Sequence, residues 1–384
     1  MENNTQLKEM IRSMVIDILQ GQKQEMASSQ PIKQAPRGQV EPGVFDTVDE
    51  AIQAAKAAQA RFEDCTLATR EKVIADIRAA MRPRVKELAQ KTVEETGMGR
   101  VADKVLKLNL TLNKTPGVED LVTECETGDN GMTLYELSAY GVIGAITPST
   151  NPAETLICNT IGMLAAGNAV FFSVHPGAKH LSRLLVSELN QIIAKSIGIE
   201  NLIVTLREPS IESAQEMMLH PDVSLLVVTG GPGVVKQALQ SGKKVIGAGA
   251  GNPPAFVDET ADIKKAAQDI VLGASLDNNI LCIAEKSVVA MRQIEPQLDQ
   301  EMVKAGCVLV ENQQDIQRLV DLTVLPNGTP NKKFVGKNAS VILDAAHIPY
   351  NGDPRLIIMR APKNHPFAVI EMLMPILPVV TVDS

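Results

Sequence analysis

The segment between residues 141 and 242 constrains the fold most strongly, because short apolar runs alternate there with amphipathic stretches of helical period. Two of the amphipathic stretches close at Gly167 and Gly198, as helices commonly do. A strand–helix alternation that repeats four times is typical of a parallel sheet covered by helices, so the sequence predicts an α/β fold. The expected strands are 141–147, 168–174, 201–206 and 223–229, and the expected helices are 152–167, 180–198, 210–219 and 232–242.

Elements are also expected on both sides of this alternating part. Residues 49–63 and 70–97 carry apolar side chains at helical spacing, and the second segment closes at the helix-stopping Gly97. A polar stretch then leads to the first expected strand. Near the end of the chain, the apolar run at 371–380 is expected to form another strand.

The composition argues against several functional classes. Of the 384 residues 45 are acidic and 37 basic, and the net charge of −8 disfavours nucleic-acid binding. No apolar run reaches the roughly 18 residues of a membrane helix, and the N-terminus lacks the apolar core of a signal peptide. The five scattered cysteines, without a CxxC pair, are typical of reduced thiols and not of disulfides or a zinc site. We therefore expect a cytoplasmic protein, with two or three domains for its length.

The first 43 residues differ from the rest of the chain. Residues 1–20 are expected to form an amphipathic helix, and residues 21–43, rich in Gln, Ser, Pro and Gly, a flexible linker. The helix could dock on its own domain, or it could lay its apolar face into the groove of a partner. Acidic residues offset the basic ones on its polar face, so a membrane-surface role is disfavoured. The apolar stripe consists of Leu7, Met10, Ile11, Met14, Val15, Ile18 and Leu19.

Two glycine-rich segments are candidates for holding a phosphate. Residues 247–251 lack the GxGxxG spacing of a dinucleotide fingerprint and run into a strand, which favours a tight backbone passage. Residues 229–233 are better placed, because a strand precedes them and a helix follows. The free N–H groups and the dipole at such a helix start could hold a pyrophosphate, although a structural turn explains the pattern equally well.

Seven segments, taken together and in this order, resemble the aldehyde dehydrogenase superfamily. The resemblance is to its CoA-acylating branch from bacterial microcompartments, which oxidises propionaldehyde in propanediol utilisation or acetaldehyde in ethanolamine utilisation. It covers the chain from about residue 40 onward. The segments are 95–100, 147–152, 167–179, 229–235, 247–254, 277–286 and 371–380.

This resemblance implies a domain organisation and a location. It implies a Rossmann-type NAD-binding domain at 44–245, with an oligomerisation flap near 125–140, and an α/β catalytic domain at 246–384. Family members continue further at the C-terminus, so the catalytic domain is expected to be incomplete. The helix at 1–20 would bind microcompartment shell or cargo proteins, and the full-length form would be a homo-oligomer inside such a compartment.

The resemblance also implies the site residues. The nucleophile falls on Cys282, although an isolated cysteine is more often buried and inert. Asn151 matches the asparagine whose amide holds the oxyanion, with helix capping as its ordinary role. Glu371 matches the glutamate that binds the nicotinamide ribose. The cofactor-phosphate segment falls on Thr229, Gly230, Gly231 and Gly233. No metal is implied.

One departure from the hydrolytic members concerns the second half of the reaction. Those enzymes carry a glutamate general base where this sequence places Gly247. Without that carboxylate, water is poorly activated to cleave a thioester, whereas the thiol of CoA needs no such base once it is partly ionised. The resemblance therefore implies oxidation of a small aldehyde by NAD through a cysteine thioester, followed by acyl transfer to coenzyme A.

Two alternatives remain open at this point. One is a hydrolytic NAD(P)-dependent aldehyde dehydrogenase, against which the missing glutamate speaks. The other is an inactive, shortened cargo protein of the microcompartment, suggested by the helix at 1–20 and by the expected incompleteness of the catalytic domain. The preference for NAD over NADP is an expectation from the family alone.

Overall fold

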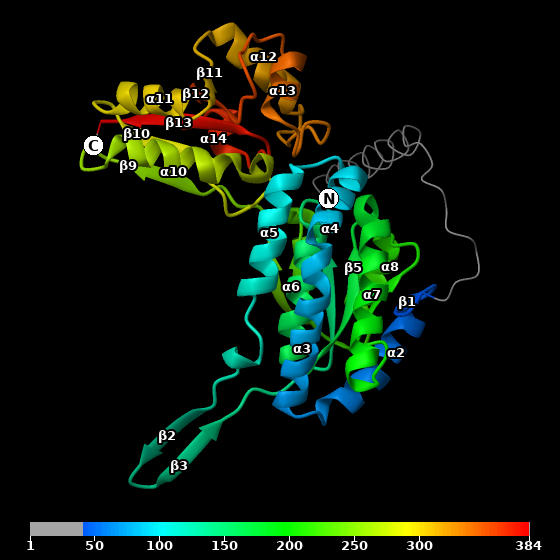
Figure 1. The fold of residues 1–384 in the computed structure, drawn as a ribbon. Coiled ribbons are helices and arrows are strands. Elements are labelled where there is room, and N and C mark those ends of the chain that lie inside the picture. The colour runs from blue at the N-terminus through cyan, green and yellow to red at the C-terminus, as the bar shows by residue number, and fades with distance from the viewer. Residues whose placement is uncertain (1–40, 384) are drawn as a thin grey trace, which may run out of the picture. The chain divides into compact units, whose positions relative to one another are not determined.

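The computed structural model describes residues 41–383, which form two parallel sheets with covering helices and one separate hairpin (Figure 1). The predicted helix at 1–20 lies outside the described residues, as does the predicted linker except for its last three residues. No described helix is both long enough and apolar enough to cross a membrane.

The first sheet has six parallel strands in the order β1-β6-β5-β4-β7-β8. Its four middle strands, β4 to β7, confirm the predicted alternation, and β4, β5 and β6 are buried along their whole length, as expected for strands covered on both faces. The strands are β1 (Val44–Phe45), β4 (Val142–Thr147), β5 (Ala169–Val174), β6 (Ile203–Leu206), β7 (Val223–Thr229) and β8 (Lys244–Ala248). The connecting helices are α6 (Pro152–Ala165), α7 (Lys179–Ile197), α8 (Ile211–Leu219) and α9 (Pro232–Leu239).

The helices before this sheet depart from the prediction at one place. The continuous helical segment expected at 70–97 is divided by the 3-10 turn η1 (Arg82–Arg84), because Pro83 lacks the N–H that an uninterrupted helix requires. Gly97 ends the last helix in the left-handed conformation, as predicted (φ 64°). The helices are α2 (Val48–Glu63), α3 (Leu67–Met81) and α4 (Val85–Thr96).

Helix α5 (Val101–Lys114) occupies the stretch that the sequence analysis treated as polar. Its buried face carries Lys104 and Lys107 beside Leu108 and Leu112. Two lysines in the apolar stripe hide the helical period, because a search for that period counts only apolar side chains. Both of these buried lysines contact Asp277, which lies near the candidate nucleophile.

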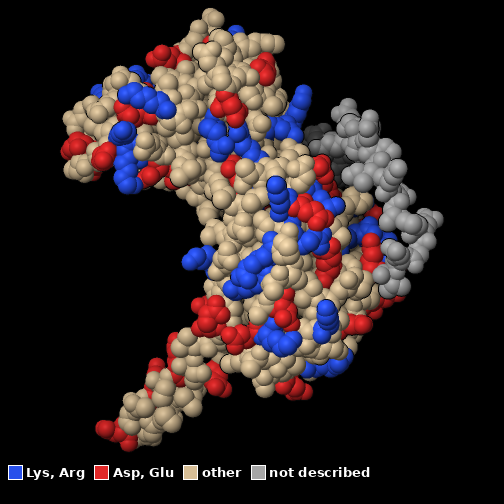
Figure 2. Space-filling model, viewed as in Figure 1, with Lys and Arg blue, Asp and Glu red and all other residues tan. Residues whose placement is uncertain are grey.

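The hairpin of β2 (Glu124–Gly128) and β3 (Gly131–Tyr135) lies within the segment predicted as a flap. It projects away from the sheets, and every residue of both strands is exposed (Figure 1). Its surface is largely uncharged, with acidic residues and no Lys or Arg (Figure 2). Exposed side chains such as Met132, Leu134 and Leu137 make this an apolar surface of the kind that marks protein interfaces. Its oligomerisation role remains a prediction.

The second sheet has five parallel strands in the order β11-β12-β13-β10-β9. The chain passes from the first sheet to the second between Ala248 and Pro254, just beyond the domain boundary predicted at 245/246. The strand expected at 371–380 begins only at Ile376, because Leu373 has a left-handed backbone and Pro375 follows it. The strands are β9 (Pro254–Val257), β10 (Ser287–Met291), β11 (Cys307–Leu309), β12 (Leu356–Arg360) and β13 (Ile376–Val382). The helices are α10 (Ile263–Ser275), α11 (Glu295–Lys304), α12 (Gln313–Thr323), α13 (Ala339–Ala345) and α14 (Pro366–Val369).

Candidate active site

The order of strands in the first sheet brings two predicted site segments together. From β4 the chain adds β5 and β6 on one side, then crosses back and adds β7 and β8 on the other. Strands β4 and β7 are direct neighbours, with Ile146 opposite Val228, so the loops that follow Thr147 and Thr229 leave the same edge. Open α/β sheets bind ligands in the crevice at such a switch point. Asn151 and residues 229–233 both follow strands that end at this switch point.

The loop at 229–233 presents an open helix start. Gly231 is the N-cap of α9 and gives it no side-chain capping bond, while Pro232 occupies the first turn. A Cβ atom added at Gly231 or Gly233 would meet no atom within 4 Å, so these glycines lie next to open space. Free N–H groups at a helix start with open space in front of them fit a phosphate group. This geometry favours the phosphate interpretation of the loop.

Asn151 lies directly before α6 but does not cap it. Its side chain makes no capping hydrogen bond to the helix. Instead, its Oδ1 accepts a very short hydrogen bond from Lys107 Nζ, and its Nδ2 donates to Thr150 Oγ1 at 3.2 Å. Asn151 therefore does not act as a helix cap, and its side-chain amide is oriented by Lys107 and Thr150.

Cys282 lies in a turn between η4 (Leu276–Asn279) and β10, and its residue is partly exposed. Three consecutive residues before it, Asp277, Asn278 and Asn279, have left-handed backbones with φ of 50°, 56° and 63°. Each such conformation is unfavourable for a residue other than glycine and persists only where its surroundings enforce it. All three are buried and hydrogen-bonded; Asn279 Nδ2, for example, donates to Ala274 O at 2.6 Å and to Glu285 O at 2.9 Å.

The turn is also held by Lys286, which is only 3 % exposed. Its Nζ donates to Asn279 O at 3.0 Å and to Leu281 O at 2.6 Å, the carbonyls on the N-terminal side of Cys282. Burial lowers the pKa of Lys286 to about 8, while negative charge on Glu371 and Cys282 acts in the opposite direction. A cationic side chain therefore lies beneath the turn that carries the thiol.

Glu371 lies in the same region. Burial raises the pKa of its carboxyl, opposed by a backbone hydrogen bond from Gly251 and by the charge of Lys286. Its Oε1 is buried and has no hydrogen-bond partner among the described residues. A buried acceptor without a partner requires an explanation, and a hydroxyl donor from a ligand, such as a ribose, would satisfy it.

The glycine-rich segment at 247–251 joins these residues. A Cβ atom at Gly251 would lie 2.7 Å from the carbonyl oxygen of Cys282, so only glycine allows the two backbones to approach this closely. This confirms the interpretation of the segment as a tight backbone passage. Cys282 and Glu371, far apart in sequence, are thus brought together around Gly251 and Lys286.

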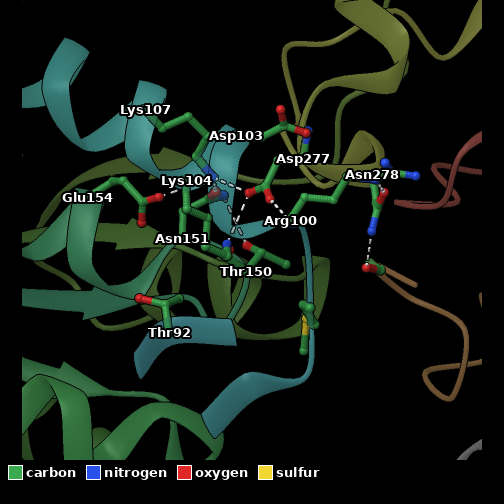
Figure 3. A network of polar contacts seen from close by, with 12 residues as sticks. Thr92, Arg100, Asp103, Lys104, Lys107, Thr150, Asn151, Glu154, Asp277 and Asn278 are labelled. Atoms are coloured by element: carbon green, nitrogen blue, oxygen red, sulfur yellow. Dashed lines mark hydrogen bonds and ion pairs between the residues drawn. The ribbon is translucent and has the colours of Figure 1, made fainter. Parts of the chain in front are cut away.

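A buried network of charges links Asn151 to the turn of Cys282 (Figure 3). Asp277 Oδ2 accepts from Lys104 Nζ at 3.0 Å and from Lys107 Nζ at 2.5 Å. Lys107 Nζ also lies 3.2 Å from Glu154 Oε1. All four charged residues are at most 7 % exposed, so their charges are compensated only by one another and by nearby polar groups. Within the described residues, the hydrogen bonds connect Asn151 to this turn through Lys107 and Asp277, and not directly.

Lys104, Lys107 and Lys286 were not among the predicted site residues. A signal was present for the first two, because they lie three positions apart and precede Leu108 and Leu112 on the same helix face. Two lysines on an otherwise apolar face predict buried acidic partners. Nothing local to residue 286 indicates that its side chain turns back beneath the preceding carbonyls.

A family model and individual related proteins both match this chain. The model of the aldehyde dehydrogenase family matches residues 18–326. The propanal dehydrogenase (CoA-propanoylating) of Salmonella typhimurium is 46% identical over 383 residues, which cover 100% of this chain and 80% of that protein.

Two solved structures share the fold, each with a TM-score of 0.87 and each covering 90% of this chain and 79% of the other. One is the propionaldehyde dehydrogenase of Rhodopseudomonas palustris with bound CoA and an acylated cysteine, 48% identical to this chain. The other is a propionaldehyde dehydrogenase from the fucose utilisation bacterial microcompartment of Clostridium phytofermentans, 47% identical. The chain therefore belongs to the aldehyde dehydrogenase family.

Proposed function

We propose that this protein oxidises a short-chain aldehyde, propionaldehyde or acetaldehyde, to its acyl-CoA with a nicotinamide dinucleotide as oxidant. The observation that carries the proposal is the partly exposed Cys282, held in a rigid turn above a buried cation and beside the unpartnered Glu371. The similarity to a CoA-propanoylating propanal dehydrogenase and to a structure with an acylated cysteine supports this chemistry.

In the first half-reaction, the thiolate of Cys282 attacks the aldehyde carbonyl and forms a carbon–sulfur bond. The carbonyl oxygen becomes an oxyanion, and the Nδ2–H of Asn151 and the backbone N–H of Cys282 are the donors proposed to stabilise it. A bound nicotinamide dinucleotide would supply the acceptor for the hydride that leaves the same carbon as the carbonyl re-forms. Cys282 then holds the acyl group as a thioester.

Two features of the chain fit the dinucleotide. The uncapped start of α9, at Gly231, can receive phosphate oxygens, and the unpartnered Oε1 of Glu371 can accept from a ribose hydroxyl. Both would orient the cofactor without taking part in a covalent step. Their assignment rests on the geometry of these atoms and on the family.

In the second half-reaction, the sulfur of CoA attacks the thioester, displaces the Cys282 thiolate and yields acyl-CoA. The expected position of the hydrolytic base, Gly247, lies in β8 and offers no carboxylate to activate water. This favours transfer to a thiol over hydrolysis. The hydrolytic alternative would require another base.

We further propose that residues 1–20 direct the enzyme to a bacterial microcompartment and that the β2–β3 hairpin contacts other copies of the chain. The predicted helix with its apolar stripe from Leu7 to Leu19 would need a partner surface, since so short a helix is marginal alone in water. The related enzyme of a fucose utilisation microcompartment supports this location. The exposed Leu134 and Leu137 of the hairpin segment favour its burial between subunits.

The first test is NADH formation from propionaldehyde with and without CoA. Cys282→Ala is expected to lower turnover at least about a hundredfold while nucleotide binding stays within about twofold, because the covalent step is lost and the cofactor loop is untouched. Cys158→Ala, which removes an exposed thiol on α6, is the matched control and should keep its activity. The assignment of Cys282 as nucleophile would be refuted if Cys282→Ala retained more than a few per cent of activity. It would also be refuted if Cys158→Ala lost as much activity as Cys282→Ala. A wild-type chain without turnover would instead favour the inactive cargo alternative.

Gly247→Glu tests whether the missing carboxylate at position 247 is what favours acyl transfer to CoA over hydrolysis. Gly247 does not have a left-handed backbone, and its new Cβ would lie 3.1 Å from Val235 Cγ1, so a small shift of one methyl group accommodates it. The variant is expected to release some propionate without CoA, at roughly 1–10 % of the acyl-transfer rate. Gly247→Gln has the same shape without the carboxylate and should release none. A folded Gly247→Glu variant that makes no free acid would contradict the assigned position.

Lys286→Met tests the cation beneath the nucleophile. Alkylation by iodoacetamide requires the thiolate, so loss of the nearby positive charge is expected to slow modification of Cys282 by roughly three- to tenfold at pH 7. Since the pKa of Lys286 is about 8, the charge is present below that pH and lost above it. The ratio of wild-type to variant rates should therefore fall toward one above about pH 9.

The rates would be followed by mass spectrometry of the peptide that contains Cys282, which separates it from the other thiols. Lys264→Met, an exposed lysine on α10, should behave like the wild type. Equal rates for Lys286→Met and wild type at pH 7, or a ratio independent of pH, would show that Lys286 does not act on the thiol.

Fusion of residues 1–20 to a fluorescent reporter tests the location. The fusion is expected to enter a microcompartment, and Ile11→Glu together with Val15→Lys should abolish entry because both lie in the apolar stripe. Glu9→Lys, on the polar face, should change entry little. Turnover of the enzyme without residues 1–20 should equal that of the full chain. A diffuse reporter would refute the targeting role, and loss of stability on deletion would make the helix structural.

A further inference from the structure

We infer that Lys107 is a positioning residue that fixes the orientation of the Asn151 amide, so that its N–H end is presented to the reacting carbonyl. The inference rests on the proposed function, because it concerns the donor to the oxyanion. It assigns a role to a residue on α5 that does not itself touch the substrate.

The ammonium of Lys107 is surrounded by three acceptors. It contacts Asn151 Oδ1, lies 2.5 Å from Asp277 Oδ2 and lies 3.2 Å from Glu154 Oε1 (Figure 3). The side chain is 7 % exposed, so water does not compete for its three N–H groups. Two of its N–H groups therefore donate to Asn151 and Asp277, the Glu154 carboxylate adds an ion pair, and together these contacts restrict the ammonium.

This arrangement leaves one orientation for the amide of Asn151. A lysine ammonium donates hydrogen bonds and cannot accept them, so only the carbonyl end of the amide can face it. The planar amide then turns Nδ2 away from Lys107, where one N–H donates to Thr150 Oγ1 at 3.2 Å. The second N–H of Nδ2 remains available for an oxyanion. A flipped amide would place Oδ1 there instead, and two oxygens carrying negative charge would repel each other.

Lys107 also links the donor to the nucleophile. Asp277 precedes Cys282 by five residues, and its carboxylate shares Oδ2 between Lys107 and Lys104. Lys104 donates to Thr150 O at 3.3 Å as well, which holds the backbone beside Asn151. Through these hydrogen bonds the two lysines connect the segment of Asn151 and the turn of Cys282 to one buried carboxylate, that of Asp277. Of the two, only Lys107 contacts the amide of Asn151.

A double-mutant cycle tests this role on the full chain. The four proteins are wild type, Lys107→Met, Asn151→Ala and the double variant, each assayed for kcat and for KM of propionaldehyde. Asn151→Ala is expected to lower kcat by about a hundredfold or more. Lys107→Met should lower kcat by roughly ten- to a hundredfold with KM changed less than about threefold, because transition-state stabilisation is lost. In the double variant, loss of Lys107 should lower kcat clearly less than it does in the wild type, because the part of its effect that acts through the Asn151 amide is already gone and only the part that acts through Asp277 is left.

Two further variants serve as controls. Lys114→Met removes an exposed lysine of the same helix and should leave kcat unchanged in both backgrounds. Lys107→Gln can still donate an N–H to Asn151 Oδ1 and should recover part of the loss. Losses that multiply in the double variant, a change in KM instead of kcat, or an unchanged kcat would overturn the inference.

A measurement independent of turnover separates this inference from the proposed function. In protein labelled with ¹⁵N-asparagine, the side-chain NH₂ signals of Asn151 are assigned by their absence in Asn151→Ala. They should shift or broaden in Lys107→Met and stay unchanged in Lys114→Met. Unchanged signals in Lys107→Met would overturn the role of Lys107 whatever the activity. A wild-type chain without turnover, but with signals that shift, would refute the proposed function alone.

Discussion

The buried pairing of Asp277 with Lys104 and Lys107 is the interaction on which the candidate site depends. Asp277 and Lys104 are fully buried, and a buried charge is tolerated only when it is paired and hydrogen-bonded. The lysines come from α5, which packs against α4 and α6, whereas Asp277 belongs to the turn between α10 and β10 of the second sheet. Removing one partner would leave an uncompensated buried charge, which typically costs about 3–5 kcal/mol. The pairing therefore fixes where the nucleophile turn lies against α5.

The conformation of that turn follows from its hydrogen bonds. Asp277, Asn278 and Asn279 adopt left-handed backbones at a combined cost of a few kcal/mol. Their side chains bond to α5 and its approach, to the loop near Gly336 and to the end of α10, while Lys286 holds the carbonyls that follow. A turn constrained from several sides keeps a thiol in one place. Such rigidity is what covalent catalysis requires of a nucleophile that must meet both an aldehyde and, later, a second thiol.

Much of the first sheet could be predicted from local pattern. Strands that are buried on both faces form continuous apolar runs, so β4 to β7 were predicted within one or two residues. The break at Pro83 was also within reach of the sequence, since proline cannot continue a helix. Helix α5 was missed, because two buried lysines interrupt its apolar stripe. Likewise, Cys282 and Glu371 were identified by family resemblance, and no spacing along the chain indicates that Gly251 and Lys286 bring them together.

Local pattern in the sequence specifies many of the elements and one group of the candidate site, the glycines at the start of α9, which stand between a strand and a helix. The thiol of Cys282 and the missing carboxylate at 247 were instead assigned by resemblance to the aldehyde dehydrogenase family. The orientation of the Asn151 amide and the position of Lys286 beneath the nucleophile turn are seen only in the folded chain. The reason is physical: a side-chain orientation and a buried charge are set by partners far away in the chain, and those partners become neighbours only when the strands pair and the helices pack.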